Sequence, residues 1–140
     1  MPEIVYPLRA YHGAGVKVLV RSREGAHVEG LLPVTKPLAA YLDTGASVTV
    51  LDPGVIRWLG LEAVGEAGLH VLGRDEVSFH AAYEVEIGLA TGTGQQDWVP
   101  VTALEGTINP KGTAAALGRD FLAHFHLHYD GPAGRFTLRW

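Results

Sequence analysis

The chain of 140 residues has no cysteine, a single methionine and no long apolar run. Without cysteine it cannot form a disulfide framework or a thiolate zinc site, and it has no thiol nucleophile. No apolar stretch reaches the roughly 20 residues that a membrane-spanning helix needs. The segment from Met1 to Val5 lacks the basic and apolar regions of a secretory signal. We therefore expect a soluble, cytoplasmic protein without a membrane partner.

Positive charge is also scarce. Lysine and arginine number 11 against 15 aspartates and glutamates, which gives a formal net charge of −4 and a pI near 5.9. No run of basic residues is available to follow a phosphate backbone, so no nucleic-acid partner is expected. Because 47% of the residues are apolar, the chain can bury one core of ordinary size. This predicts a single domain over residues 1–140.

Short strand-like segments separated by turns fill most of the sequence. Residues 15–34 are typical of an opening hairpin, because Val16, Val18 and Val20 recur with period two. Further strands are predicted at 39–42, 48–51, 76–80, 83–87 and 98–104, followed by a closing hairpin over 127–140. The glycine-rich segment 91–94 lacks the strand–turn–helix setting of a nucleotide-binding loop and is interpreted as a turn.

Two short helices are predicted. The first runs from Pro53 to Leu59, since Asp52 suits an N-cap, Pro53 the first helical position and Gly60 a stop. Its apolar residues are expected to cover the core: Val55, Ile56, Trp58 and Leu59. The second helix is expected just after Gly118.

The most informative segment runs from Leu42 to Ser47 and reads Leu-Asp-Thr-Gly-Ala-Ser. Apolar or strand-forming residues flank it, so Asp43 is expected on a tight turn between buried segments. Far downstream, Leu117 and Gly118 end an apolar run that leads into the second helix. Together these segments resemble the retropepsin family of retroviral-type aspartic proteases, in which a hydrophobic-hydrophobic-Gly strand packs beside an Asp-Thr-Gly loop. The resemblance spans about residues 16–125.

The resemblance implies an all-β, retropepsin-like acid protease fold: a closed, strand-rich domain with one or two short helices and one lobe per chain. Asp-Thr-Gly occurs once, whereas the chemistry needs two carboxylates, so a homodimer is implied. The expected activity is that of an aspartic endopeptidase acting on peptide or protein substrates. Two Asp43 side chains, one per subunit, would share a proton and activate a water. Neither a metal nor a cofactor is required.

The residues after Asp43 have roles that the resemblance implies. In the family, the position of Thr44 hydrogen-bonds to the opposite loop, and Gly45 allows backbone N–H groups to approach the carboxylate. Ala46 lacks the hydroxyl that pepsin-like enzymes usually place here to stabilise the ionised form. We therefore expect the carboxylate pair to keep its proton to higher pH, with activity at mildly acidic pH.

Ser47 departs from the retroviral pattern. Retroviral proteases commonly have an acidic residue here, which pairs with the arginine of the downstream Gly-Arg element. Arg119 therefore needs another partner, either Asp120 of the partner subunit or a backbone carbonyl. A helix start with a local charge pair is an equally good interpretation of Arg119 and Asp120. Leu117, Gly118 and Arg119 are expected to support the Asp43 loop.

In a retropepsin the interval 69–89 holds the flap, a hairpin that closes over the substrate. We expect its tip near Leu72, Gly73 and Arg74, because glycine at a hairpin tip permits a positive φ and close approach to a peptide.

Two other functions fit parts of the sequence. A noncatalytic retropepsin-fold module could bind a peptide or a partner, and Asp43 would then only hydrogen-bond its own turn. A metal-dependent hydrolase could use His124, His126 and His128, which alternate along one strand. A simpler interpretation is that the histidines form the solvent side of the closing strand, because the complementary, apolar face is occupied by Phe125, Leu127 and Tyr129.

Overall fold

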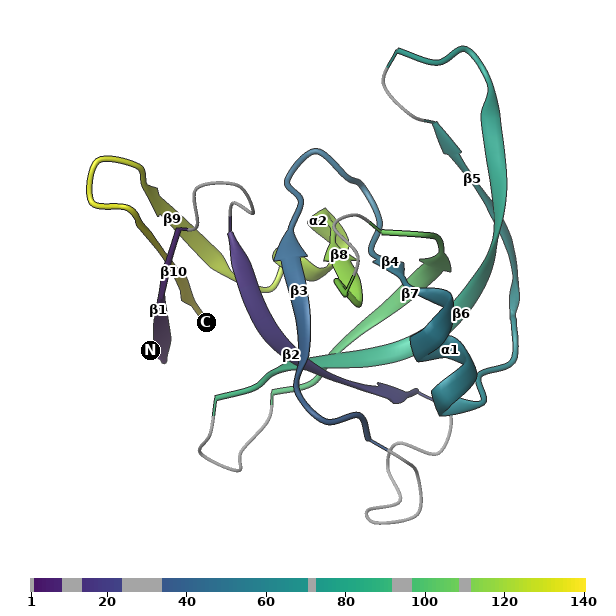
Figure 1. The fold of residues 1–140 in the computed structure, drawn as a ribbon, viewed down its shortest axis with the longest axis horizontal. Coiled ribbons are helices and arrows are strands. Elements are labelled where there is room, and N and C mark those ends of the chain that lie inside the picture. The colour runs from purple at the N-terminus through teal and green to yellow at the C-terminus, as the bar shows by residue number, and fades with distance from the viewer. Residues whose placement is uncertain (1, 9–13, 24–33, 71–72, 92–96, 109–111) are drawn as a thin grey trace.

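A computed structural model describes residues 2–8, 14–23, 34–70, 73–91, 97–108 and 112–140. Within these residues the chain forms ten strands and two short helices (Figure 1). Seven strands belong to one sheet and three to another. The expected all-β class is confirmed.

The larger sheet is closed into a barrel. Its strands are β2 (Gly15–Ser22), β3 (Leu38–Leu42), β4 (Val50–Leu51), β5 (Gly65–His70), β6 (Val77–Leu89), β7 (Val99–Glu105) and β8 (Ala115–Leu117). They follow the order β2-β3-β8-β4-β7-β6-β5, and a further pairing between β2 and β6 closes the first six into a ring. β5 stays outside the ring, where it pairs with β6.

The pairings around β8 position the candidate site. β8 lies parallel to β3, with Leu42 beside Leu117, and antiparallel to β4, with Val50 beside Ala116. The loop from β3 to β4 therefore crosses the end of β8. This crossing brings the segments that follow Leu42 and Leu117 together, although about 75 residues separate them along the chain.

The core fills the barrel from alternating strand positions. Val16, Val18 and Val20 of β2 and Val85 and Ile87 of β6 are buried, because alternate side chains of a strand point to the same face.

The period-two valines predicted β2 as the first strand of an opening hairpin. In the sheet, β2 pairs with β3 and β6. Most of the predicted second half of an opening hairpin lies outside the described residues, as does most of the turn at 91–94.

Helix α1 (Pro53–Leu59) forms where its end signals predict it. The Asp52 side chain accepts the Gly54 N–H at 2.8 Å, and Gly60 ends the helix with a φ of 63°. Trp58, however, is 61% exposed and does not join the core as expected. Helix α2 (Arg119–Leu122) is a single turn that buries Phe121. Within the residues that the structure describes, neither helix has the length and apolar character that crossing a bilayer requires.

The smaller sheet has the order β1-β10-β9, from β1 (Glu3–Pro7), β10 (Arg135–Arg139) and β9 (His126–Asp130). β9 and β10 confirm the predicted closing hairpin, whereas β1 was not predicted. Tyr6 of β1 stacks on the buried Phe136 at a centroid distance of 5.0 Å. Tyr129 is 63% exposed, so it does not form the apolar side expected of this hairpin.

β6 also differs from the prediction, because the two strands expected at 76–80 and 83–87 are one continuous strand of 13 residues. Its first part pairs with β5 and its second part with β7. The change of partner along a single strand explains why the sequence pattern suggested two.

Candidate active site

Asp43 lies at the first position after β3, on a tight turn. Its backbone N–H donates to the carbonyl of Leu117 at 2.8 Å, and its own carbonyl accepts the N–H of Ala46 at 3.1 Å. The side chain is partly exposed, and its Oδ1 accepts the Gly45 N–H at 3.1 Å. The carboxylate thus stands on a turn that the end of β8 holds in place.

Gly45 lies close against this carboxylate. A Cβ at this position would come within 3.3 Å of Asp43 Oδ1, which is tighter than an ordinary contact. A larger residue would therefore press on the acidic group. The absence of a side chain leaves room for the hydrogen bond from the Gly45 N–H to Asp43 Oδ1.

Arg119 holds the same turn from the other side. Its Nη1 donates to the carbonyl of Thr44 at 2.9 Å, and its backbone N–H donates to the carbonyl of Ala46 at 2.9 Å. Of the alternatives left open by Ser47, the structure shows the backbone carbonyl. Thr44 and Ser47 are themselves exposed, so both side chains are accessible in the single chain.

Gly118 packs directly against the backbone of the loop. A Cβ there would lie 2.6 Å from both the carbonyl carbon and the carbonyl oxygen of Val48. Because backbone atoms cannot move aside as a flexible side chain can, this crossing requires glycine.

Thr49 is a fully buried polar residue of the site that the sequence interpretation missed. Its hydroxyl donates to Asp120 Oδ1 at 2.8 Å and accepts the Gly118 N–H at 3.1 Å. Asp120 is therefore satisfied within its own chain. The available signal was a hydroxyl residue inside the apolar run 48–51.

Tyr41 is a second neighbour of Asp43 that the sequence did not single out. Burial and then the negative charge of Asp43 raise the pKa of its phenol. Tyr41 precedes Asp43 by two positions, which places both on the same side of the chain where β3 ends. The two groups interact electrostatically at the edge of the candidate site.

β5 and the first part of β6 form a hairpin that projects beyond the barrel, at the upper right of Figure 1. Its last pair joins His70 to Val77. Gly73, with a φ of 84°, and Arg74 lie in the connection between them. Leu72, the third residue expected at the tip, falls outside the described residues.

His126 and His128 are exposed on β9, whereas His124, also exposed, lies in the turn after α2, so the three histidines do not alternate along one strand as expected. Across the described part of the chain, no group of three or more His, Asp or Glu side chains is placed to hold a metal ion.

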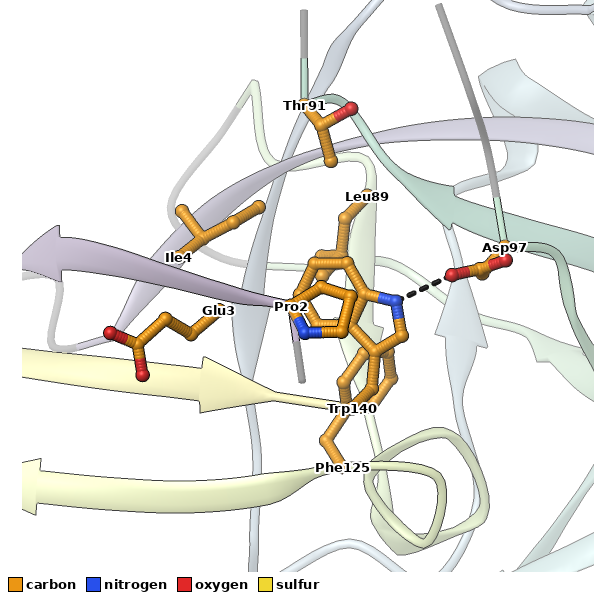
Figure 2. A pocket seen from close by; sticks show the side chains of 8 residues that line it. All are labelled: Pro2, Glu3, Ile4, Leu89, Thr91, Asp97, Phe125 and Trp140. Atoms are coloured by element: carbon orange, nitrogen blue, oxygen red, sulfur yellow. Dashed lines mark hydrogen bonds between the residues drawn. The ribbon is translucent and has the colours of Figure 1, made fainter. Parts of the chain in front are cut away.

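A separate cavity of about 340 Å³ lies beside β1 (Figure 2). It is lined by Pro2, Glu3, Ile4, Leu89, Thr91, Asp97, Phe125 and Trp140. The Trp140 indole N–H donates to the Asp97 carboxylate, and its ring meets Phe125 edge-on at 5.7 Å. No residue of the Asp43 loop lines this cavity.

Comparison with known proteins gives structural matches alone. No protein-family model matches the sequence, and no curated protein matches it significantly. A retropepsin-like aspartic protease from Rickettsia conorii shares 16% identity with a TM-score of 0.57, over 98% of this chain and 89% of that one. The retroviral protease-like domain of Ddi1 from Leishmania major shares 12% identity with a TM-score of 0.48, over 89% and 88%. An EIAV protease with a bound inhibitor shares 20% identity with a TM-score of 0.40, over 69% and 90%.

The likeness to the Rickettsia protein establishes the architecture. The chain has the retropepsin-like fold, as its Asp-Thr-Gly loop and Leu-Gly-Arg element predicted. At 16% identity the likeness concerns the fold, and activity has to be argued from the site.

Proposed function

We propose that this chain is an aspartic endopeptidase whose active site forms between two copies, each a single domain that supplies one Asp43. The observation that carries the proposal is the way the Asp43 turn is built. The end of β8 and the start of α2 hold its backbone through the Leu117 carbonyl and the Arg119 guanidinium, while the carboxylate stays partly exposed. A turn that served only itself would not need this support from a distant segment.

The chemistry follows from pairing two identical acids. Two carboxylates within hydrogen-bond distance cannot both ionise, so they hold one proton between them, and aspartic proteases are the standard example of this coupling. The ionised Asp43 would take a proton from a water, which then attacks the peptide carbonyl. The protonated Asp43 would donate its proton to the carbonyl oxygen.

The substrate would be an extended peptide between the Asp43 loops and the β5–β6 hairpin, which we assign as the flap. A strand-like peptide can hydrogen-bond its backbone to neighbouring strands irrespective of its side chains. Phe79 and Val77 of the hairpin are 72% and 50% exposed, and in register they share the face on which Tyr83, Val85 and Ile87 enter the core. This face offers apolar contacts to a peptide.

The decisive experiment compares the wild type with Asp43→Asn on a mixed peptide library, with the mass in solution measured for both. We expect both to be dimers and the wild type alone to cleave. Asp97→Asn is a matched control, because its new amide oxygen can still accept the Trp140 indole N–H. Unchanged cleavage by Asp43→Asn would end the catalytic assignment.

A mixing experiment tests whether the site is shared. If each active site needs two Asp43 side chains, a dimer of one wild-type chain and one Asp43→Asn chain is inactive. With equal amounts of exchanging wild-type and Asp43→Asn chains, half of the wild-type chains sit in mixed dimers, and activity per wild-type chain falls to about one half. A wild-type protein that binds peptides without cutting them would instead favour the noncatalytic module.

A further inference from the structure

We propose that His80 is a positioning residue that anchors the β5–β6 hairpin to the barrel and so fixes the hairpin relative to Asp43. The proposal deepens the function proposed above, since it rests on this hairpin being the flap. The anchor itself is defined by the contacts of His80 and can be tested without any catalysis.

His80 lies where β6 leaves the barrel. From Ala82, opposite Leu104, to Ile87, opposite Val99, β6 pairs with β7. Toward its beginning, from Ala82 back to Val77, β6 pairs with β5. His80 is therefore in the hairpin, two residues beyond the last β6–β7 pair.

The imidazole of His80 spans this junction. Its Nδ1 lies 2.8 Å from the carbonyl oxygen of Glu105, the last residue of β7. A carbonyl oxygen can only accept, so Nδ1 carries a proton and donates it. On the other side, Nε2 lies 2.7 Å from Ser78 Oγ, which is 3.5 Å from the carbonyl oxygen of Leu69 in β5. Because Nε2 then accepts the single Ser78 hydroxyl proton, the link to the barrel is the Glu105 bond of His80 in β6. β5 is held to β6 through their backbone pairing.

The barrel end of this link also supports the Asp43 loop. Leu104, next to Glu105, donates its N–H to the carbonyl of Thr49 at 3.0 Å. Glu105 itself lies beside Leu51 in the β4–β7 pairing. The Glu105 carbonyl, which accepts the His80 N–H, thus belongs to β7, the strand that also pairs with the end of the Asp43 loop. A short series of hydrogen bonds therefore connects His80 with that loop.

Among its described residues, 65–70 and 77–81, the hairpin has no fully buried side chain. Most of its described residues are exposed, including Val77 and Phe79, and a two-stranded hairpin is at best marginally stable by itself. A hydrogen bond at its root therefore has a large effect on its orientation.

The test measures hydrogen–deuterium exchange in the Asp43→Asn background. His80→Leu removes the donor, whereas His80→Asn keeps an N–H donor at the δ position. We expect His80→Leu to speed exchange of hairpin amides, residues 65–70 and 77–81, roughly two- to tenfold relative to β2 amides. His80→Asn should stay near the parent, and Ser78→Ala, which leaves the Glu105 contact intact, should change exchange less than His80→Leu.

Three results would overturn the proposal: no change in His80→Leu, an equal increase throughout the barrel, or His80→Asn as fast as His80→Leu. With Asp43 present, we expect His80→Leu to raise KM by a similar factor with a smaller change in kcat, because substrate must then order the hairpin. If exchange responds but no variant cleaves peptides, the anchor stands and the protease assignment fails. If Asp43→Asn abolishes cleavage but exchange does not respond, the anchor alone fails.

Discussion

Thr49 and Asp120, 71 positions apart in the sequence, are joined by two hydrogen bonds. The Thr49 hydroxyl donates to Oδ1 of Asp120 at 2.8 Å and its backbone N–H donates to Oδ2 at 3.0 Å. The same hydroxyl accepts the Gly118 N–H at 3.1 Å. This pair fastens the loop that carries Asp43 to the start of α2.

Thr49→Val should destabilise the fold, because valine keeps the shape of threonine and removes its hydroxyl. The buried Gly118 N–H would lose its partner and Asp120 one of its donors. We expect a loss of roughly 2–3 kcal/mol in the free energy of unfolding, measured by urea denaturation. Thr49→Ser keeps the hydroxyl and should lose about 1 kcal/mol for one buried methyl group. Equal stabilities for the two variants would contradict this account.

The two glycines of the site should separate stability from activity. Gly118→Ala sets a Cβ against the Val48 backbone at 2.6 Å, so we expect a loss of about 2–3 kcal/mol in unfolding free energy. Gly45→Ala meets only the Asp43 carboxylate, a side chain that can turn away. It should unfold close to the wild type but cleave peptides roughly tenfold more slowly or worse. A large loss of stability in Gly45→Ala, or normal stability with slow cleavage in Gly118→Ala, would count against this description of the site.

Arg119→Leu should impair cleavage more than folding. The guanidinium is exposed, so losing its bond to the Thr44 carbonyl should cost about 1 kcal/mol or less. The freed turn would no longer hold Asp43 in place, and we expect at least a roughly tenfold fall in kcat/KM. Arg139→Leu, which breaks an exposed ion pair with Glu3, is the control and should cleave normally.

The wild-type protein should lose stability at alkaline pH, and Tyr6→Phe should lose less. Burial raises the pKa of Tyr6 from its ordinary 10.0 to about 12, so the folded chain holds the phenolic proton more tightly than the unfolded chain does. This contribution is fully present below pH 10 and is lost as pH rises toward about 12. Urea midpoints at pH 9 and 11 should therefore differ less in Tyr6→Phe than in the wild type. The remaining difference should include Tyr41 and Tyr83, whose pKa values burial also raises.

The same variant should not weaken the protein at neutral pH. The Tyr6 hydroxyl is buried without a hydrogen-bond partner in the described structure, and phenylalanine keeps the stack on Phe136. Unfolding free energies at pH 7 should be equal or higher for Tyr6→Phe. A clear loss would show that the hydroxyl has a partner.

The sequence predicted those parts of the fold that are specified locally. Asp52 and Gly60 mark the ends of α1 by chemistry that acts within a few residues, and both do so in the structure. The turn at Asp43 was predictable for the same reason. Alternating valines predicted β2, since one side of that strand is buried.

Features that depend on distant partners were missed. β1 is short, ends in Pro7 and is buried only in part, so nothing local distinguishes it. Thr49 joins the site through Asp120, which no pattern around either residue reveals. Trp58 was wrongly placed in the core, because helical spacing alone does not say how far a buried face extends.

The pairing of β1 with β10, from Glu3 beside Arg139 to Pro7 beside Arg135, sets an order of events on the ribosome. Of the described strands, β1 is synthesised first and its partner last, so at ordinary translation rates it waits on the order of ten seconds. During that time Ile4 and Tyr6 have no partner strand, so they remain unpaired in the nascent chain. The smaller sheet can therefore assemble only when translation of β10 is complete.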